Sequence, residues 1–128
     1  MTIKILVVDD ERSIADSLVE IVHGAGYEAM AAYSAADALA KVPEFCPNIL
    51  LTDVLMPGQN GFDLALEIKR LCPDARLLLF SGQASTAQLA SAYGPMFTSR
   101  GYRFELLPKP LHPASLLKKL EETLTHAA

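Results

Sequence analysis

The segment IKILVVDDE, residues 3–11, passes abruptly from apolar to acidic residues. Five of its first six residues are apolar, which is typical of a strand buried on both faces of a sheet. The run stops at Asp9, Asp10 and Glu11. We therefore predict a buried first strand over residues 3–8 that ends in carboxylates.

The rest of the chain alternates between apolar runs and amphipathic segments. Further strands are predicted over residues 28–32, 48–52, 75–80 and 104–107. Helices are predicted over residues 11–25, from the N-cap Ser34 to about Pro43, over 62–72, from Ser85 onward, and over 113–124. This order indicates βαβ units and a parallel sheet with helices on both faces. With no repeat or linker in sight, we predict a single α/β domain over residues 1–128.

The helix that opens near Ser85 contains its own breaker, Gly94-Pro95. Proline lacks the backbone N–H that a helix interior uses, and its ring clashes with the preceding turn. We expect this helix to break or kink before Met96.

The composition argues against several classes of protein. The net charge is −4 and the lysines and arginines are scattered, so we expect no direct contact with nucleic acid. Apolar runs fall far short of the roughly 20 residues of a membrane span, and the N-terminus has no signal-peptide pattern. Cys46 and Cys72 are isolated in the sequence, without the C-x-x-C spacing of a metal site, so we expect neither zinc nor a disulfide. This use of cysteine is typical of a reduced, cytoplasmic setting.

Polar residues interrupt the apolar pattern where the predicted strands end. Asp9 and Asp10 follow the first strand and Asp53 the third, while Ser81 and Lys109 follow the fourth and fifth. The carboxyl ends of parallel strands share one edge, and ligands bind in the crevice there. We expect these five side chains to meet.

Such a cluster suits phosphoryl chemistry. Three converging carboxylates repel one another unless a cation neutralises them, and oxygen ligands of this kind suit Mg²⁺. An aspartate can attack phosphorus, and the moving phosphoryl group then needs a metal, a hydroxyl and an ammonium around it. Each residue alone has an ordinary explanation as a cap, a turn or a solvated charge. Their joint occurrence at four strand ends favours the phosphoryl interpretation.

Four motifs in order give the sequence a family resemblance: Val7 to Glu11, Asp53 to Gly58 with Gly61, Phe80 to Gly82, and Lys109-Pro110. Together they resemble the receiver domain of two-component response regulators. The resemblance spans essentially the whole chain and implies a flavodoxin-like, doubly wound, five-stranded parallel sheet of order 2-1-3-4-5 with five helices.

The resemblance also implies roles for individual residues. Asp53 would be the phosphoacceptor, with Mg²⁺ held by Asp9, Asp10, Asp53 and the backbone carbonyl of Leu55. Ser81 and Lys109 would bind phosphoryl oxygens. The donor would be a sensor histidine kinase or a histidine phosphotransfer protein. No output domain follows in this sequence, so we expect a stand-alone receiver that acts on a partner protein.

The sequence departs from the family pattern in its switch region. Leu106 stands where the family usually has an aromatic residue, and alternation places the nearest aromatic, Phe104, on the same face of the strand. The stretch from Ser81 to Lys109 is longer than usual, which predicts an unusual fourth helix or exit loop. Leu55 and Gln83 lie beside the expected phosphorylation site, where a bulky Leu55 would slow loss of the phosphoryl group.

Two other functions compete with the phosphoacceptor interpretation. A metal-dependent phosphatase with an aspartyl-phosphate intermediate uses similar groups, but it normally needs a second acid where Leu55 stands. A pseudo-receiver would keep the fold as an interaction module without phosphorylation, against which the complete set of site residues argues. We expect no enzyme activity beyond self-phosphorylation from small donors and autodephosphorylation, and no role as phosphodonor or ligand for His23, His112 or His126.

Overall fold

The computed structural model describes residues 2–82 and 86–125 of the chain. Within these ranges, strands and helices alternate as β1 (Lys4–Val8), α1 (Arg12–Gly24), β2 (Glu28–Ala32), α2 (Ala35–Lys41), β3 (Ile49–Asp53), α3 (Gly61–Leu71), β4 (Arg76–Ser81), α4 (Thr86–Ser99), β5 (Glu105–Pro108) and α5 (Pro113–Thr125). No helix among the described residues is long and apolar enough to span a membrane.

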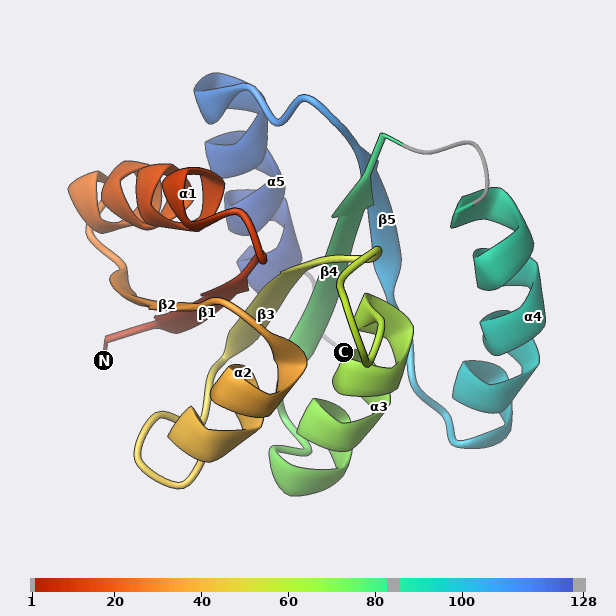
Figure 1. Cartoon of the computed structure of the whole chain (residues 1–128). Helices are drawn as coiled ribbons and strands as arrows, with labels where there is room; N and C mark the ends of the chain where they lie inside the picture. The colour runs from red at the N-terminus through yellow and green to blue at the C-terminus, as the bar shows by residue number, and fades with distance from the viewer. Residues whose placement is uncertain (1, 83–85, 126–128) are drawn as a thin grey trace.

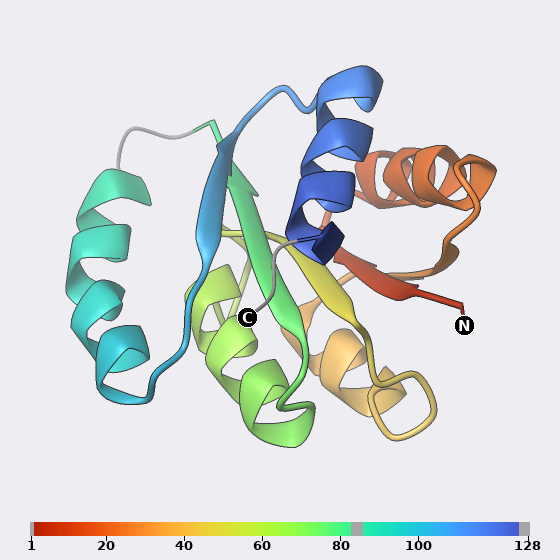
Figure 2. The same ribbon diagram turned by 180° about the vertical axis from the view of Figure 1, so that it is seen from behind.

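The strands form one parallel sheet in the order β2-β1-β3-β4-β5. Helices α1 and α5 cover one face of the sheet, and α2, α3 and α4 cover the other (Figures 1 and 2). All strands therefore present their carboxyl ends at the same edge. The predicted doubly wound fold and its strand order are confirmed.

Each face of the sheet has its own hydrophobic core. Successive side chains of β1 point to opposite faces, so Ile5 and Val7 pack beneath α1 and α5 while Leu6 and Val8 pack beneath α2 and α3. All four are fully buried. This two-sided burial explains why the first strand reads as a continuous apolar run.

Local sequence sets several helix ends. The Ser34 hydroxyl accepts a hydrogen bond from the Asp37 N–H at 3.0 Å and caps α2, as predicted. Asn60 caps α3 in the same way through the Asp63 N–H. After α1, Gly26 adopts a φ of 100°, a conformation that glycine reaches without steric cost.

Helix α4 does not break at Gly94-Pro95, and it continues to Ser99. The expectation of a break is therefore wrong, because packing outweighs the local preference, and a kink at Pro95 stays a prediction. Tyr93 and Phe97 lie one turn apart on either side of Pro95, and both rings contact Phe62 of α3, with centroids 5.2 and 6.3 Å away. Ser91, whose carbonyl loses its partner to the proline, is exposed to water.

Cys46 and Cys72 form a disulfide, with their Cα atoms 6.0 Å apart. The expectation of two unpaired thiols is therefore wrong. Cys46 lies in the loop between α2 and β3, and Cys72 follows the last residue of α3. The fold brings these two points together across a sequence separation of 26, a proximity that their spacing alone does not reveal.

Candidate functional site

Three carboxylates meet at the carboxyl edge of the sheet. Asp53 is the last residue of β3, and Asp9 follows β1, whose Val8 lies beside Thr52 in the sheet register. Oxygens of Asp9, Asp10 and Asp53 all lie within 4.8 Å of one another. Asp9 and Asp53 are buried, whereas Asp10 is exposed. The predicted acidic cluster is confirmed as a geometric arrangement.

Backbone contacts hold the two buried acids in place. The Asp9 Oδ1 atom accepts a hydrogen bond from the Glu11 N–H at 3.0 Å, which ties it to the start of α1. The loop after β3 folds back so tightly that a Cβ atom on Gly61 would collide with the carbonyl oxygen of Asp53. Gly61 also donates its N–H to the Val54 carbonyl at 2.8 Å. A glycine is therefore required where α3 begins beside the site.

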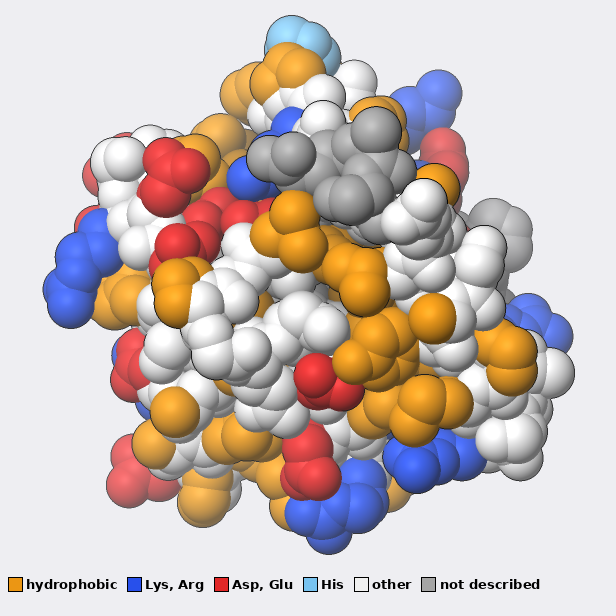
Figure 3. All heavy atoms as spheres, turned by 45° about the vertical axis from the view of Figure 1, so that its right-hand side comes forward, with side chains coloured by type: hydrophobic (Ala, Val, Ile, Leu, Met, Phe, Trp, Pro, Cys, Tyr) orange, Lys and Arg blue, Asp and Glu red, His pale blue; other side chains and the backbone are white. Residues whose placement is uncertain are grey.

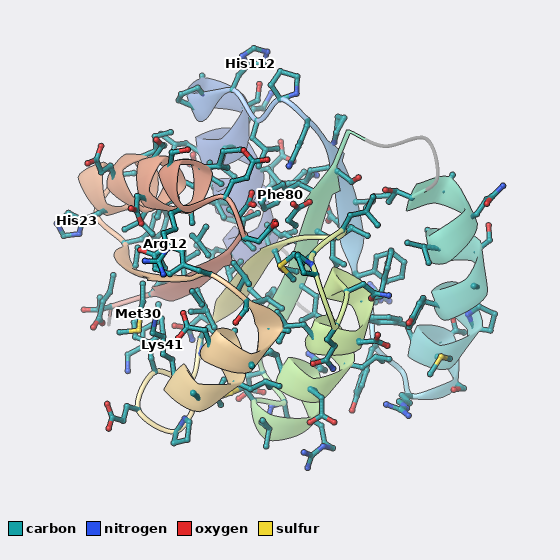
Figure 4. The ribbon with its side chains drawn as sticks, viewed as in Figure 1. Arg12, His23, Met30, Lys41, Phe80 and His112 are labelled. Atoms are coloured by element: carbon teal, nitrogen blue, oxygen red, sulfur yellow. A yellow bond between two sulfur atoms is a disulfide. The ribbon has the colours of Figure 1, made fainter. Side chains whose placement is uncertain are left out.

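Lys109 brings a positive charge into the cluster from the segment after β5. Its Nζ atom lies 3.4 Å from Asp53 Oδ2 and 3.9 Å from Asp9 Oδ2. The ammonium also lies 5.2 Å from the ring centroid of Phe80, which is labelled in Figure 4 and belongs to β4. The Lys109 N–H donates to the Ser81 carbonyl at 3.2 Å, so the two strand ends are joined.

The Ser81 hydroxyl has a neighbour that the sequence did not reveal. Its Oγ lies 2.5 Å from the Thr86 Oγ1, in the first turn of α4, and Thr86 is buried. This contact links the end of β4 to α4 at the edge of the site. A threonine at a helix start reads as an ordinary capping or surface residue, so the sequence carries no signal for this role.

Burial dominates the electrostatics of the site. It raises the pKa of Asp9 from its ordinary 3.8 to about 6, and the negative charge of Asp53 adds to the effect while the Glu11 N–H opposes it. Burial also raises the pKa of Asp53, against the opposing charge of Lys109. In the described part of the chain, the Lys109 ammonium thus lies near Asp9 and Asp53, while Asp10 adds a third negative charge to the cluster.

The residues present fit a divalent cation. Among the described side chains, the Asp9 Oδ2 atom is buried with no hydrogen-bond partner, although a buried oxygen normally has one. Three carboxylates, one of them exposed, supply the hard oxygen ligands that Mg²⁺ prefers while leaving room for water or phosphate oxygens.

The other predicted residues lie around this cluster. Leu55 follows the site in the loop after β3, and 37% of its surface is exposed. Gln83 and His126 lie outside the described residues. His23 and His112 are exposed and point outward from the end of α1 and from the segment before α5 (Figure 4).

Leu106 and Phe104, the residues at which the sequence departs from the family pattern, differ in their surroundings. Leu106 lies beside Leu79 in the sheet register and is 40% exposed. Phe104 packs instead into an aromatic cluster, with its ring centroid 5.3 Å from Phe62 and 4.7 Å from Phe97. Phe104 packs against the core beneath α3 and α4, and Leu106 lies beside Leu79 of that same core, so the two residues share one face as alternation predicted.

A five-stranded doubly wound sheet that gathers acids, a hydroxyl and a lysine at its carboxyl edge defines a class, the flavodoxin-like signalling domains. A family model, the response regulator receiver domain, matches residues 5–121. The chain belongs to this family, which confirms the predicted resemblance and places the protein within two-component signalling.

Individual relatives agree with this assignment. The chain is 33% identical over 120 residues to the DNA-binding transcriptional regulator NtrC of Azospirillum brasilense, covering 94% of this chain and 24% of that protein. It is 28% identical to the chemotaxis protein CheY of Thermotoga maritima, covering 93% and 95% of the two chains. A CheY-like receiver domain from Methanospirillum hungatei superposes with a TM-score of 0.81 at 30% identity, covering 97% and 94%. The chain thus spans about a quarter of NtrC and nearly all of CheY.

Proposed function

We propose that this protein is a phosphoacceptor switch whose Asp53 carboxylate takes a phosphoryl group from a phosphohistidine. The observation that carries the proposal is the position of Asp53, which shares an oxygen cluster with Asp9 and Asp10 and lies 3.4 Å from the Lys109 ammonium. In the transfer, an Asp53 oxygen forms a bond to phosphorus as the P–N bond to the donor imidazole breaks. The imidazole nitrogen keeps the electron pair.

The surrounding residues would stabilise this transfer. Asp9, Asp10, Asp53 and the Leu55 carbonyl would hold Mg²⁺, which supplies positive charge to the phosphoryl oxygens. The Lys109 ammonium already lies within reach of Asp53 and would pair with a second phosphoryl oxygen. The Ser81 hydroxyl would leave Thr86, its present neighbour, and bind a third.

We further propose that the donor is a sensor histidine kinase or a histidine phosphotransfer protein, and that the phosphorylated state acts on a downstream protein. Family membership supports both, and a cytoplasmic location follows from such partners. The only activity we assign is self-phosphorylation from small donors and autodephosphorylation. Any DNA-binding or chemotactic output, as in the relatives' names, would belong to partners or to further domains.

Intact-mass measurement with acetyl phosphate and Mg²⁺ tests the proposal. We expect wild type to gain the mass of one phosphoryl group and Asp53→Asn to gain none. Asp74→Asn, an exposed acid after α3, is the matched control and should react like wild type. Omitting Mg²⁺ or adding a chelator should suppress the adduct.

Other outcomes identify the competing functions. Folded wild type that acquires no adduct would contradict the phosphoacceptor proposal and favour a pseudo-receiver. Rapid release of phosphate from many phosphate esters would favour a phosphatase.

A further inference from the structure

The two cysteines of the chain differ in their access to solvent. Cys46 lies in an exposed position of the loop over residues 42–48. Cys72 is 3% exposed and directly follows α3, where its N–H donates to the Ile68 carbonyl at 2.7 Å. Of the two residues, Cys46 is therefore the one that a small thiol reagent approaches from solvent. A bridge with one accessible sulfur can be attacked without unfolding the domain.

The bridge joins the loop to α3 at the edge of the sheet opposite the carboxylates. Cys46 precedes the first residue of β3 by three positions, while Asp53 is the last residue of that strand. Next to Cys46, the Phe45 ring is buried in the same hydrophobic core as Cys72. The disulfide thus fixes the loop over this core without touching the acidic site.

We propose that Cys46 and Cys72 form a reversible redox-modification site that takes a low-molecular-weight disulfide, such as glutathione disulfide, as its reactant. In oxidation, the Cys46 thiolate attacks that disulfide, forms a mixed disulfide and releases one thiol. The Cys72 thiolate then attacks the Cys46 sulfur and displaces the second thiol. Both cysteine protons go to the two released thiols, and reduction runs the same steps backward.

The bridge changes stability rather than the site chemistry. It closes a loop over a sequence separation of 26, which removes entropy from the unfolded chain. The closed loop contains β3 and α3, and the oxidised protein as a whole is therefore more stable against unfolding than the reduced protein. In the reduced protein the loop keeps its backbone hydrogen bonds to the Lys41 carbonyl and the burial of Val42 and Phe45, and it loses its covalent tie to Cys72.

In the experiment, the full chain is equilibrated without phosphodonor in a series of buffers that differ in the ratio of oxidised to reduced glutathione. Free thiols are then trapped with maleimide and counted by intact mass. We expect one transition, from two trapped thiols to none, that reverses when the ratio is reversed. The oxidised protein should melt about 10 °C above the reduced one. Cys46→Ser should melt like reduced wild type in both buffers, because its remaining Cys72 is buried and has no partner.

Three results would overturn the proposal. Two trapped thiols at every ratio would show that no bridge forms, and none at every ratio in the folded protein would show a permanent structural bridge. Equal melting of the oxidised and reduced forms would show that the bridge constrains nothing. Should Cys46→Ser fail to fold, Cys46→Ala at this exposed position replaces it, and the thiol count of wild type stands independently. Phosphorylation of Asp53 is measured separately, so failure of one proposal leaves the other intact.

Discussion

Asp9 is the most deeply buried of the three acids, and its Oδ2 atom has no hydrogen-bond partner among the described residues. The pKa of this carboxyl is raised to about 6, so the folded state binds its proton more tightly than the unfolded state does. In metal-free protein, the stability from this tighter binding is present below about pH 4 and is lost as the pH rises through about 6. The site is thus destabilised by its own charge at neutral pH.

Asp9→Asn should therefore stabilise the metal-free protein at neutral pH, on the order of 2 kcal/mol, because it removes a buried charge. Urea denaturation in a chelator, repeated across the pH range, measures the difference. The gain should shrink below pH 4, and added Mg²⁺ should stabilise wild type but hardly the variant. Asp10→Asn, at an exposed acid, is the control and should gain less. A pH profile identical to that of wild type would contradict the role assigned to Asp9.

We expect Leu55 to limit the access of water to a phosphoryl group on Asp53. Leu55 follows Asp53 by two residues, 37% of its surface is exposed, and its side chain offers no polar atom to an attacking water. Leu55→Asn should raise the rate of autodephosphorylation by up to about tenfold, because an amide can orient that water. The measurement is the decay of the phosphoryl mass after removal of the donor. Leu71→Asn changes another exposed leucine and is the control, and its phosphoryl adduct should decay at the wild-type rate. A wild-type decay rate in Leu55→Asn would refute the role expected of Leu55.

At the scale of elements, the sequence predicted nearly every strand and helix within one residue of its observed bounds. Apolar runs and helix caps such as Ser34 are local signals. Each one determines the secondary structure of the residues that carry it, so it can be read from the sequence. The acidic site was predictable because parallel strands necessarily share one edge. Helix α4, the cysteine pair and the Thr86 contact were not, since each depends on residues distant in sequence or on packing between elements.

Tyr93 links α4 to α3 and to the residues before it. The Tyr93 hydroxyl donates to Asp63 Oδ1 at 2.7 Å and accepts from the Asn60 amide at 3.2 Å, and its ring stacks on Phe62. The hydrogen bond to Asp63 raises the pKa of Tyr93. Asn60 directly precedes Gly61, which lies so close to Asp53 that no side chain would fit there. Tyr93 therefore connects α4 to the loop that follows Asp53.

Tyr93→Phe should keep the stacking and lose both hydrogen bonds, at a cost of about 1 kcal/mol in the free energy of unfolding. Amide hydrogen exchange in α4 should become faster, and the change in that exchange on Asp53 phosphorylation should become smaller. Tyr102→Phe, outside this hydrogen-bonded triad, is the matched control. If phosphorylation changes amide hydrogen exchange in α4 equally in Tyr93→Phe and wild type, the Tyr93 hydroxyl does not couple α4 to Asp53.

At the scale of the whole molecule, the two faces of the sheet differ in what they offer partners. Beside Lys109, on the side of α1, lies a groove of about 600 Å³ lined by Ile14, Leu18, Ile21, Pro110 and Leu111, among others. On the opposite side, hydrophobic side chains gather over α3 and α4 (Figure 3), and Met96 of α4 is 42% exposed. A donor docked on the first face would leave the second free for the downstream protein.

Ser17→Arg tests this division, because Ser17 is exposed on α1 and lines the groove without belonging to either core. An arginine there would fill the apolar groove with a charged side chain that a docking helix must desolvate. We expect phosphotransfer from a histidine phosphotransfer protein to slow at least about tenfold, equivalent to roughly 1.4 kcal/mol, while labelling by acetyl phosphate stays at the wild-type rate. Glu20→Arg places the same charge on an exposed α1 position outside the groove and should affect neither reaction.

Two outcomes would contradict this division of the surface. Equal loss of phosphorylation with both donors would mean that Ser17→Arg disturbs the carboxylate site itself. Unchanged transfer from the protein donor would mean that partners approach Asp53 from another side.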